Sequence, residues 1–198
     1  MGVGEPVAVR ETVWAAGTMP LCVSGYLTTP EVPLELVTSV RGIVHVRGDD
    51  GVERVVFCEN ADGRHPWPGG RRIAGESFAD TVVREVHEET GWRVEPDSLR
   101  PLGWLHLVHL GPEPAANQGP YPEFVQLIFT ATGAGRDVAL DADWDDADGY
   151  ELRSSLQTLE DARRLTSTDL LADVFVDALL ERRGEGAGRT GGCGVPRP

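Results

Sequence analysis

Residues 77–91 carry the most restrictive local pattern in the sequence, an amphipathic helix with a signal at each end. Ser77 is a suitable N-cap, and Asp80 stands three residues later, where a capping box has its acid. Gly91 fits the position just past the C-terminus. At about 100° per residue, one face of the helix is apolar: Phe78, Ala79, Val82, Val83 and Val86. A helix of this kind needs an apolar partner layer, so we expect it to pack on a sheet.

A neighbouring stripe of the same helix concentrates negative charge in Glu85, Glu88 and Glu89. Like charges three or four residues apart destabilise a helix by a few tenths of a kcal/mol per pair, roughly. Two explanations remain open at this point. The stripe is a solvated face in which Arg84 pairs with Glu88, or it is a site for a hard cation such as Mg²⁺, which prefers oxygen ligands.

The loop before the helix, residues 60–74, favours the cation site. It is longer than the usual connection and contains Pro68-Gly69-Gly70, which places open backbone close to the start of the helix. It also carries three arginines, whose guanidinium groups match phosphate oxygens: Arg64, Arg71 and Arg72. A carboxylate face beside an arginine-bearing glycine loop indicates phosphoryl chemistry.

The rest of the chain predicts an α/β (α+β) layered domain. Residues 34–47 and 52–59 read as a hairpin, and residues 102–110 and 124–132 as strands. Weaker strand character covers residues 7–14 and 21–27. An acid-rich connector follows over 137–151, and helices are expected over 156–165 and 168–183, the second ending before Gly184. We divide the chain into an N-terminal extension with added strands (1–34), a main domain (35–183) and a disordered tail (184–198).

Charge and cysteine content narrow the classes of partner. The formal net charge of −14 repels nucleic acid and anionic membranes, although a bound divalent ion reverses the local sign for a small phosphorylated substrate. The three cysteines, Cys22, Cys58 and Cys193, have no CxxC spacing. Neither a signal peptide nor an apolar run of about 18 residues is present in the sequence. We therefore expect a reduced, cytoplasmic setting and a small-molecule partner; the oligomeric state, a homodimer included, stays open.

Residues 70–92 resemble the Nudix box of the Nudix hydrolases. Gly70 is followed after five residues by Glu76, and after seven more by Arg84-Glu85-Val86-His87-Glu88-Glu89-Thr90-Gly91-Trp92. Every fixed position agrees; the departure is Trp92, where the pattern has an aliphatic residue. The resemblance covers the chain from about residue 35 to 183. It implies a Nudix fold, a mixed β-sheet sandwiched between α-helices, and hydrolysis of a nucleoside diphosphate linked to another moiety.

The resemblance also implies roles for individual residues. Glu85, Glu88 and Glu89 would bind Mg²⁺ or Mn²⁺, with the carbonyl of Gly69 as a further ligand. Glu76 and Arg84, together with Gly70 and Gly91, would hold the shape of the loop and helix. Such a cation would neutralise charge on the pyrophosphate and lower the pKa of a water, from which a carboxylate takes a proton.

Three questions stay open at this level. The catalytic base is Glu88 or Glu89, or the distal Glu123 before the 124–132 strand, with Asp145 and Asp146 as weaker candidates. Trp67 either stacks on a base or packs beneath the loop. Residues 108–110, where a proline or tyrosine would mark a subfamily, contain neither, so the substrate is not identified. The alternative to an enzyme is a silent nucleotide-binding or regulatory module with the same fold.

Overall fold

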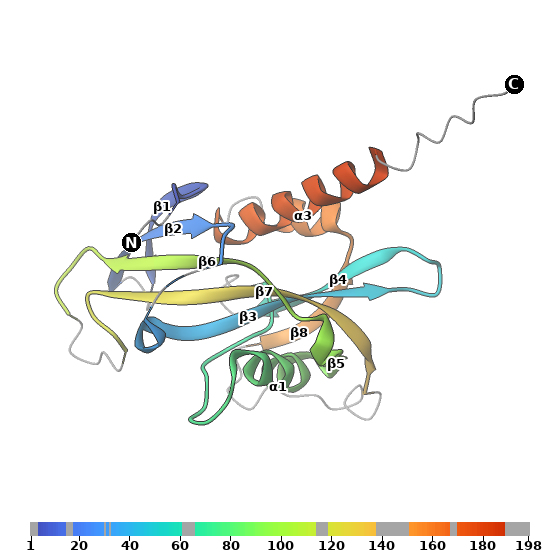
Figure 1. The fold of residues 1–198 in the computed structure, drawn as a ribbon, viewed down its shortest axis with the longest axis horizontal. Helices are drawn as coiled ribbons and strands as arrows, with labels where there is room; N and C mark the ends of the chain where they lie inside the picture. The colour runs from blue at the N-terminus through green and yellow to red at the C-terminus, as the bar shows by residue number, and fades with distance from the viewer. Residues whose placement is uncertain are drawn as a thin grey trace, which may run out of the picture.

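A computed structural model describes residues 4–14, 18–29, 31, 33–60, 66–113, 119–137, 151–166 and 170–188. A central mixed sheet lies between helices, with α1 (Phe78–Thr90) on one face and α2 (Leu159–Leu165) with α3 (Leu170–Gly188) on the other (Figure 1). The predicted layered α/β architecture is confirmed.

The sheet follows the order β1-β2-β6-β7-β3-β4-β8 in the part of the chain that the structure describes. β3 and β7 run parallel, and the other neighbours along this path are antiparallel. A further short strand, β5 (Trp92–Val94), pairs with the end of β7. The bounds are β1 Ala8–Trp14, β2 Met19–Tyr26, β3 Val37–Arg47, β4 Glu53–Asn60, β6 Arg100–His109, β7 Glu123–Arg136 and β8 Glu151–Gln157.

Successive side chains of the central strands point to opposite faces of the sheet, so a separate hydrophobic core forms on each face. On β3, Val40 and Val44 pack with Val82 and Val86 of α1. Ile43 belongs to the opposite core, which includes residues of α2 and α3 such as Leu159 and Phe175. Ser39, Arg41 and His45 share the face of Ile43 because strand side chains alternate. Polar side chains of β3 thus lie on the α2–α3 face, at both ends of the strand.

The caps of α1 are those the sequence predicts. Ser77 and Asp80 form a reciprocal capping box, and Gly91 ends the helix in the left-handed region with φ of 70°. Val82 and Val86 are fully buried against the sheet. The apolar face therefore fixes the rotation of α1, and with it the position of the glutamate stripe.

Several predicted boundaries are wrong. Residues 34–36 form a 3-10 turn before β3, and β7 continues four residues past Thr132 to Arg136. The expected helix over 156–165 begins at Leu159, because residues 151–157 form the unpredicted strand β8 against β4. The last helix runs to Gly188, past its predicted end at Arg183. β5 was also not predicted.

The two weak strands predicted in the N-terminal extension are present as β1 and β2, which pair with each other and extend the sheet from β6. Cys22 and Cys58 are free thiols, while Cys193 lies outside the described residues. No helix within the described ranges combines the length and apolar character that a membrane crossing requires.

Candidate active site

The loop before α1 is held in the sheet by backbone hydrogen bonds. β3 pairs with β4 only over His45–Arg47, so the two strands separate toward the start of β3. Gly42 N–H donates to the Pro68 carbonyl (2.8 Å) and Val40 N–H to the Gly70 carbonyl (3.0 Å). Across the gap, Cys58 N–H of β4 donates to the Pro66 carbonyl (2.8 Å). The segment from Pro66 to Gly70 thus fills a wedge in the sheet, which gives a glycine loop a fixed position.

Gly69 and Gly70 are required by close approach. Gly69 has φ of 148°, and a Cβ there would lie 2.6 Å from the Arg41 Cα. A Cβ on Gly70 would lie 2.5 Å from Glu85 Oε1. The loop backbone and the Glu85 carboxylate are therefore in contact, and this contact joins the loop to the helix.

Arg84 is the centre of the polar network on this side of α1. Its Nε donates to Glu76 Oε1 (2.6 Å), and its Nη2 donates to the Arg71 carbonyl (3.1 Å). The hydrogen bond to Arg84 lowers the pKa of Glu76 to about 2. The same pairing raises the pKa of Arg84 above its ordinary value. The predicted pairing of Glu76 with Arg84 is present, and it ties loop to helix.

The three glutamates of the stripe have different environments. Glu89 is buried, and its Oε2 accepts the Gly69 N–H (2.8 Å). Glu85 is largely buried, and desolvation raises its pKa against the lowering effect of Arg84. The Glu88 side chain is 58% exposed. Nη1 of Arg84 lies 2.9 Å from both Glu85 Oε1 and Glu88 Oε2, so one guanidinium nitrogen bridges two carboxylates.

This bridge bears on the predicted metal ligands. Within the described ranges, no three His, Cys, Asp or Glu side chains converge as a metal-binding group in this conformation. The Arg84 nitrogen instead lies where two of the three carboxylates meet. Arg84 thus holds its positive charge between two of the acids, as the pairing explanation predicts, and the cation site stays a prediction.

A pocket of about 720 Å³ opens beside the loop, on the α2–α3 face of the sheet. Gly70, Arg71 and Arg72 form one side of it, and both arginine side chains lie at its rim as exposed residues. The Arg72 guanidinium also stands 5.4 Å over the Phe78 ring. The structure brings these two predicted phosphate-binding arginines together; Arg64 lies outside the described residues.

Other predicted site residues are placed differently. Trp67 packs edge-on against Phe57 and is only 2% exposed, too buried for a base to stack on it. The prediction that it binds substrate is therefore wrong, and the packing alternative fits. Glu123, at the start of β7, pairs with His106 (Oε2 to Nε2, 2.7 Å). Asp145 and Asp146 lie outside the described residues.

The prediction missed three polar residues of the pocket, Ser39, Arg41 and Gln126. A signal for two of them was available. Ser39 and Arg41 precede Ile43 at alternate positions of a strand whose other face carries valines. Polar residues on a face that a central strand must bury indicate either an internal network or a ligand site.

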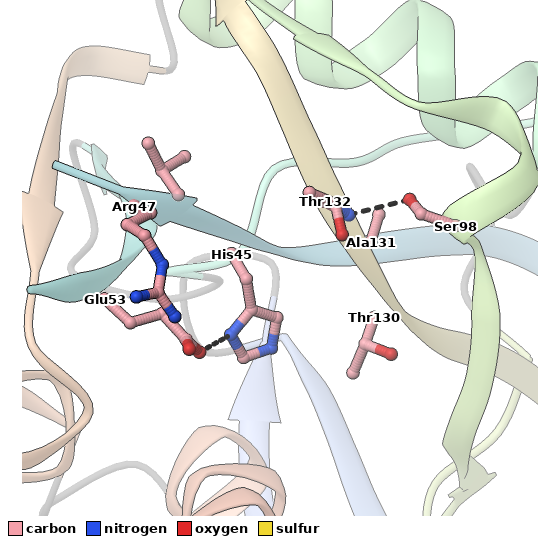
Figure 2. A pocket seen from close by; sticks show the side chains of 8 residues that line it. His45, Arg47, Glu53, Ser98, Thr130, Ala131 and Thr132 are labelled. Atoms are coloured by element: carbon pink, nitrogen blue, oxygen red, sulfur yellow. Dashed lines mark hydrogen bonds and ion pairs between the residues drawn. The ribbon is translucent and has the colours of Figure 1, made fainter. Parts of the chain in front are cut away.

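A second pocket, of about 420 Å³, lies at the other end of β3. Figure 2 shows the His45 ring turned toward Glu53, with Arg47, Thr130 and Thr132 around them. His45 Nδ1 and Glu53 Oε1 are 2.8 Å apart, and Arg183 also pairs with Glu53. The Thr132 N–H donates to Ser98 Oγ (2.7 Å). His45, Glu53, Ser98 and Thr132 thus have hydrogen-bond partners within the protein.

The chain matches the NUDIX domain family over residues 38–175. Nucleoside triphosphatase NudI of Enterobacter sp. (strain 638) is 30% identical over 121 residues, which make up 57% of this chain and 84% of that protein. The crystal structure of a mutant of the Bacillus subtilis pyrophosphohydrolase BsRppH has the same fold, with 20% identity and a TM-score of 0.53 over 92% of this chain and 98% of that one. The chain belongs to the Nudix family and is a Nudix hydrolase.

Proposed function

We propose that the protein hydrolyses the pyrophosphate linkage of a nucleoside diphosphate joined to another moiety, with Mg²⁺ or Mn²⁺ bound at the glutamate stripe. The observation that carries the proposal is the contact between the Glu85 carboxylate and the Gly70 backbone, beside a pocket rimmed by Arg71 and Arg72. Acidic oxygens for a cation and guanidinium groups for phosphate thus flank one loop.

The residues present fit a hard divalent cation. Glu85, Glu88 and Glu89 offer oxygen atoms on one helix face, and Gly70 leaves room against Glu85 that a Cβ would fill. Glu88, the most exposed of the three, can leave the Arg84 bridge at little cost because exposed ion pairs are worth about 0–1 kcal/mol. A bound cation would neutralise pyrophosphate charge and acidify a water.

The chain's own residues then have separate tasks. Arg71 and Arg72 hold phosphate oxygens at the rim of the pocket. Glu76 keeps Arg84 in place, and Arg84 holds the loop carbonyl of Arg71. Glu88 is solvent-accessible and is our candidate for the proton acceptor, with Glu89 as the alternative in the stripe. Glu123 is retained as a distal candidate, and its pairing with His106 would have to open for that role.

Product release from a substrate panel tests the proposal. ADP-ribose, nucleoside triphosphates, nucleotide sugars and dinucleoside polyphosphates are incubated with Mg²⁺, Mn²⁺ or chelator, and the products are separated by chromatography. We expect cleavage of one class only with metal, and loss of cleavage in Glu88→Gln. Nucleotide binding with no cleavage of any member would favour the silent module instead.

The cellular setting we propose is the reduced cytoplasm. Cys22 and Cys58 are both free in the structure. Thiols of this kind are kept reduced in the cytosol, whereas secreted domains of this size often form disulfides.

A further inference from the structure

The pocket beside the glycine loop has one aromatic wall, whose rings are tilted against one another. The Trp14 and Phe124 rings lie 6.3 Å apart between centroids, and the His109 and Phe124 rings 5.7 Å apart. All three residues line the pocket. Tilted rings of this kind suit a planar, partly polar ring system, which can stack on one ring and meet another edge to face.

The floor of the same pocket holds polar atoms that have no hydrogen-bond partner among the described residues. They are Ser39 Oγ, Arg41 Nε and Gln126 Oε1. Ser39 and Gln126 are each only 6% exposed. Buried polar groups in folded proteins are almost always paired, so three unpaired atoms in one pocket require an explanation.

Strand register places these atoms together. Ser39 of β3 is the register partner of Gln126 of β7, and Arg41 follows Ser39 two residues later on the same face. Phe124 precedes Gln126 by two residues, so the aromatic wall adjoins the polar floor. The Arg41 guanidinium is held by its Nη1, which donates to the Trp67 carbonyl (2.9 Å). The floor thus presents a fixed donor, an acceptor and an adaptable hydroxyl.

We propose that this pocket binds the base of the nucleotide, and that Gln126, Ser39 and Arg41 determine which base is accepted. Gln126 Oε1 accepts from an N–H on the edge of the base, and Arg41 Nε–H donates to the neighbouring ring nitrogen or carbonyl. Ser39 completes the set as donor or acceptor. A sugar or polyol lacks the flat face that the aromatic wall requires.

The direction in which the phosphates extend from this pocket rests on the proposed function. Gly70 belongs to the pocket lining and also contacts Glu85, so a nucleotide with its base on the floor extends its phosphates past Arg71 toward the glutamate stripe. Base recognition itself does not depend on cleavage, so binding is tested with ligands that the enzyme cannot cleave.

The test is calorimetric titration of the wild-type chain, in chelator, with AMP, GMP, CMP, UMP and ribose 5-phosphate. None of these ligands has a pyrophosphate linkage to cleave. We expect at least one nucleotide to bind ten times more tightly than ribose 5-phosphate. In Gln126→Leu this preference should fall about tenfold, and in Ser39→Ala by a smaller factor, with ribose 5-phosphate binding unchanged.

Gln157→Leu is the matched control, because Gln157 lies on β8 and its amide donates to Ser155 Oγ outside the pocket. It should keep the full base preference. Equal binding of all five ligands would overturn the proposal, and so would a base preference that survives both pocket substitutions. Base-selective binding with no cleavage of any member of the substrate panel would leave this proposal standing and remove the proposed function.

Discussion

The two ends of the β3–β7 pair use their polar residues in opposite ways on the same face of the sheet. At one end, Ser39 and Gln126 are register partners, and each has a buried oxygen without a hydrogen bond to the described residues. At the other end, His45 and Thr132 are register partners, and both hydrogen-bond to protein groups. Under our proposal, the first end gives up stability to keep hydrogen-bonding groups for a ligand, whereas the second completes its own network.

The largest difference should be between an acid of the glutamate stripe, which lies on α1 beside the glycine loop, and the acid at the His45 end. We expect Glu88→Gln to reduce turnover by about 10²- to 10⁴-fold, the range that a positioned proton acceptor contributes. Glu53→Gln, at the His45 end, should stay within a factor of about two. Steady-state rates on the substrate identified by the panel measure both.

Thermal melting in chelator separates catalysis from folding for the same pair. Glu88→Gln removes one exposed contact to Arg84 and also one negative charge beside Glu85. Its Tm should remain within a few degrees of wild type. A variant that unfolds, or Glu53→Gln that loses turnover as strongly as Glu88→Gln, would contradict the separation of the two ends.

The next effect concerns the loop that lies against the stripe. Gly70→Ala puts a methyl group against the Glu85 carboxylate, which must move. Displacements of about 1 Å at an active site cost up to about 10²-fold, so we expect turnover to fall by about ten- to a hundredfold. Gly4→Ala, where a Cβ meets nothing within 4 Å, should leave turnover unchanged. Normal activity of Gly70→Ala would mean that the contact with Glu85 has no catalytic role.

A smaller effect tests whether the unpaired end costs stability. Leucine in place of Gln126 removes a buried acceptor that lacks a partner, so the free energy of unfolding should rise by about 1 kcal/mol. Gln157→Leu removes a paired amide and should not raise it. Urea denaturation of the ligand-free proteins measures both changes. A loss of stability in Gln126→Leu would show that the amide is satisfied within the fold.

The sequence predicted helix α1 and its surroundings well because the determinants there are local. Ser77, Asp80 and Gly91 mark the ends of α1, and the spacing of Val82 and Val86 sets the buried face, so the glutamates follow from helix geometry. The pairing of Arg84 with Glu76 came from the family resemblance. These features depend on residues within a few turns of one another.

The meeting of Ser39 with Gln126 on the floor of the pocket was not predicted because it depends on the pairing of distant strands. Ser39 and Gln126 are brought together by the parallel register of β3 and β7, which no local pattern reports. Strand β8 was missed for a related reason, since ELRSSLQ is a polar segment that becomes a strand by pairing with β4. Base stacking and packing stayed open for Trp67 because a loop position does not reveal that the ring enters the core.

The smallest expected effect is a pH dependence at the paired end. Burial lowers the pKa of His45 below its ordinary value, against the raising effect of Glu53, and Arg183 adds to the lowering. The unfolded chain therefore takes up a proton near pH 6.5 that the folded chain binds only at lower pH. Stability contributed by neutral His45 is complete above pH 6.5 and is lost as the pH falls toward the lowered pKa.

Urea denaturation at pH 7.5 and 5.5 should show a larger loss of unfolding free energy for wild type than for His45→Gln. The difference between the two losses isolates His45 from the other histidines. A wild type that gains stability relative to His45→Gln at pH 5.5 would mean that His45 is held as a cation by Glu53, and the polar network of Figure 2 would then be an ion pair.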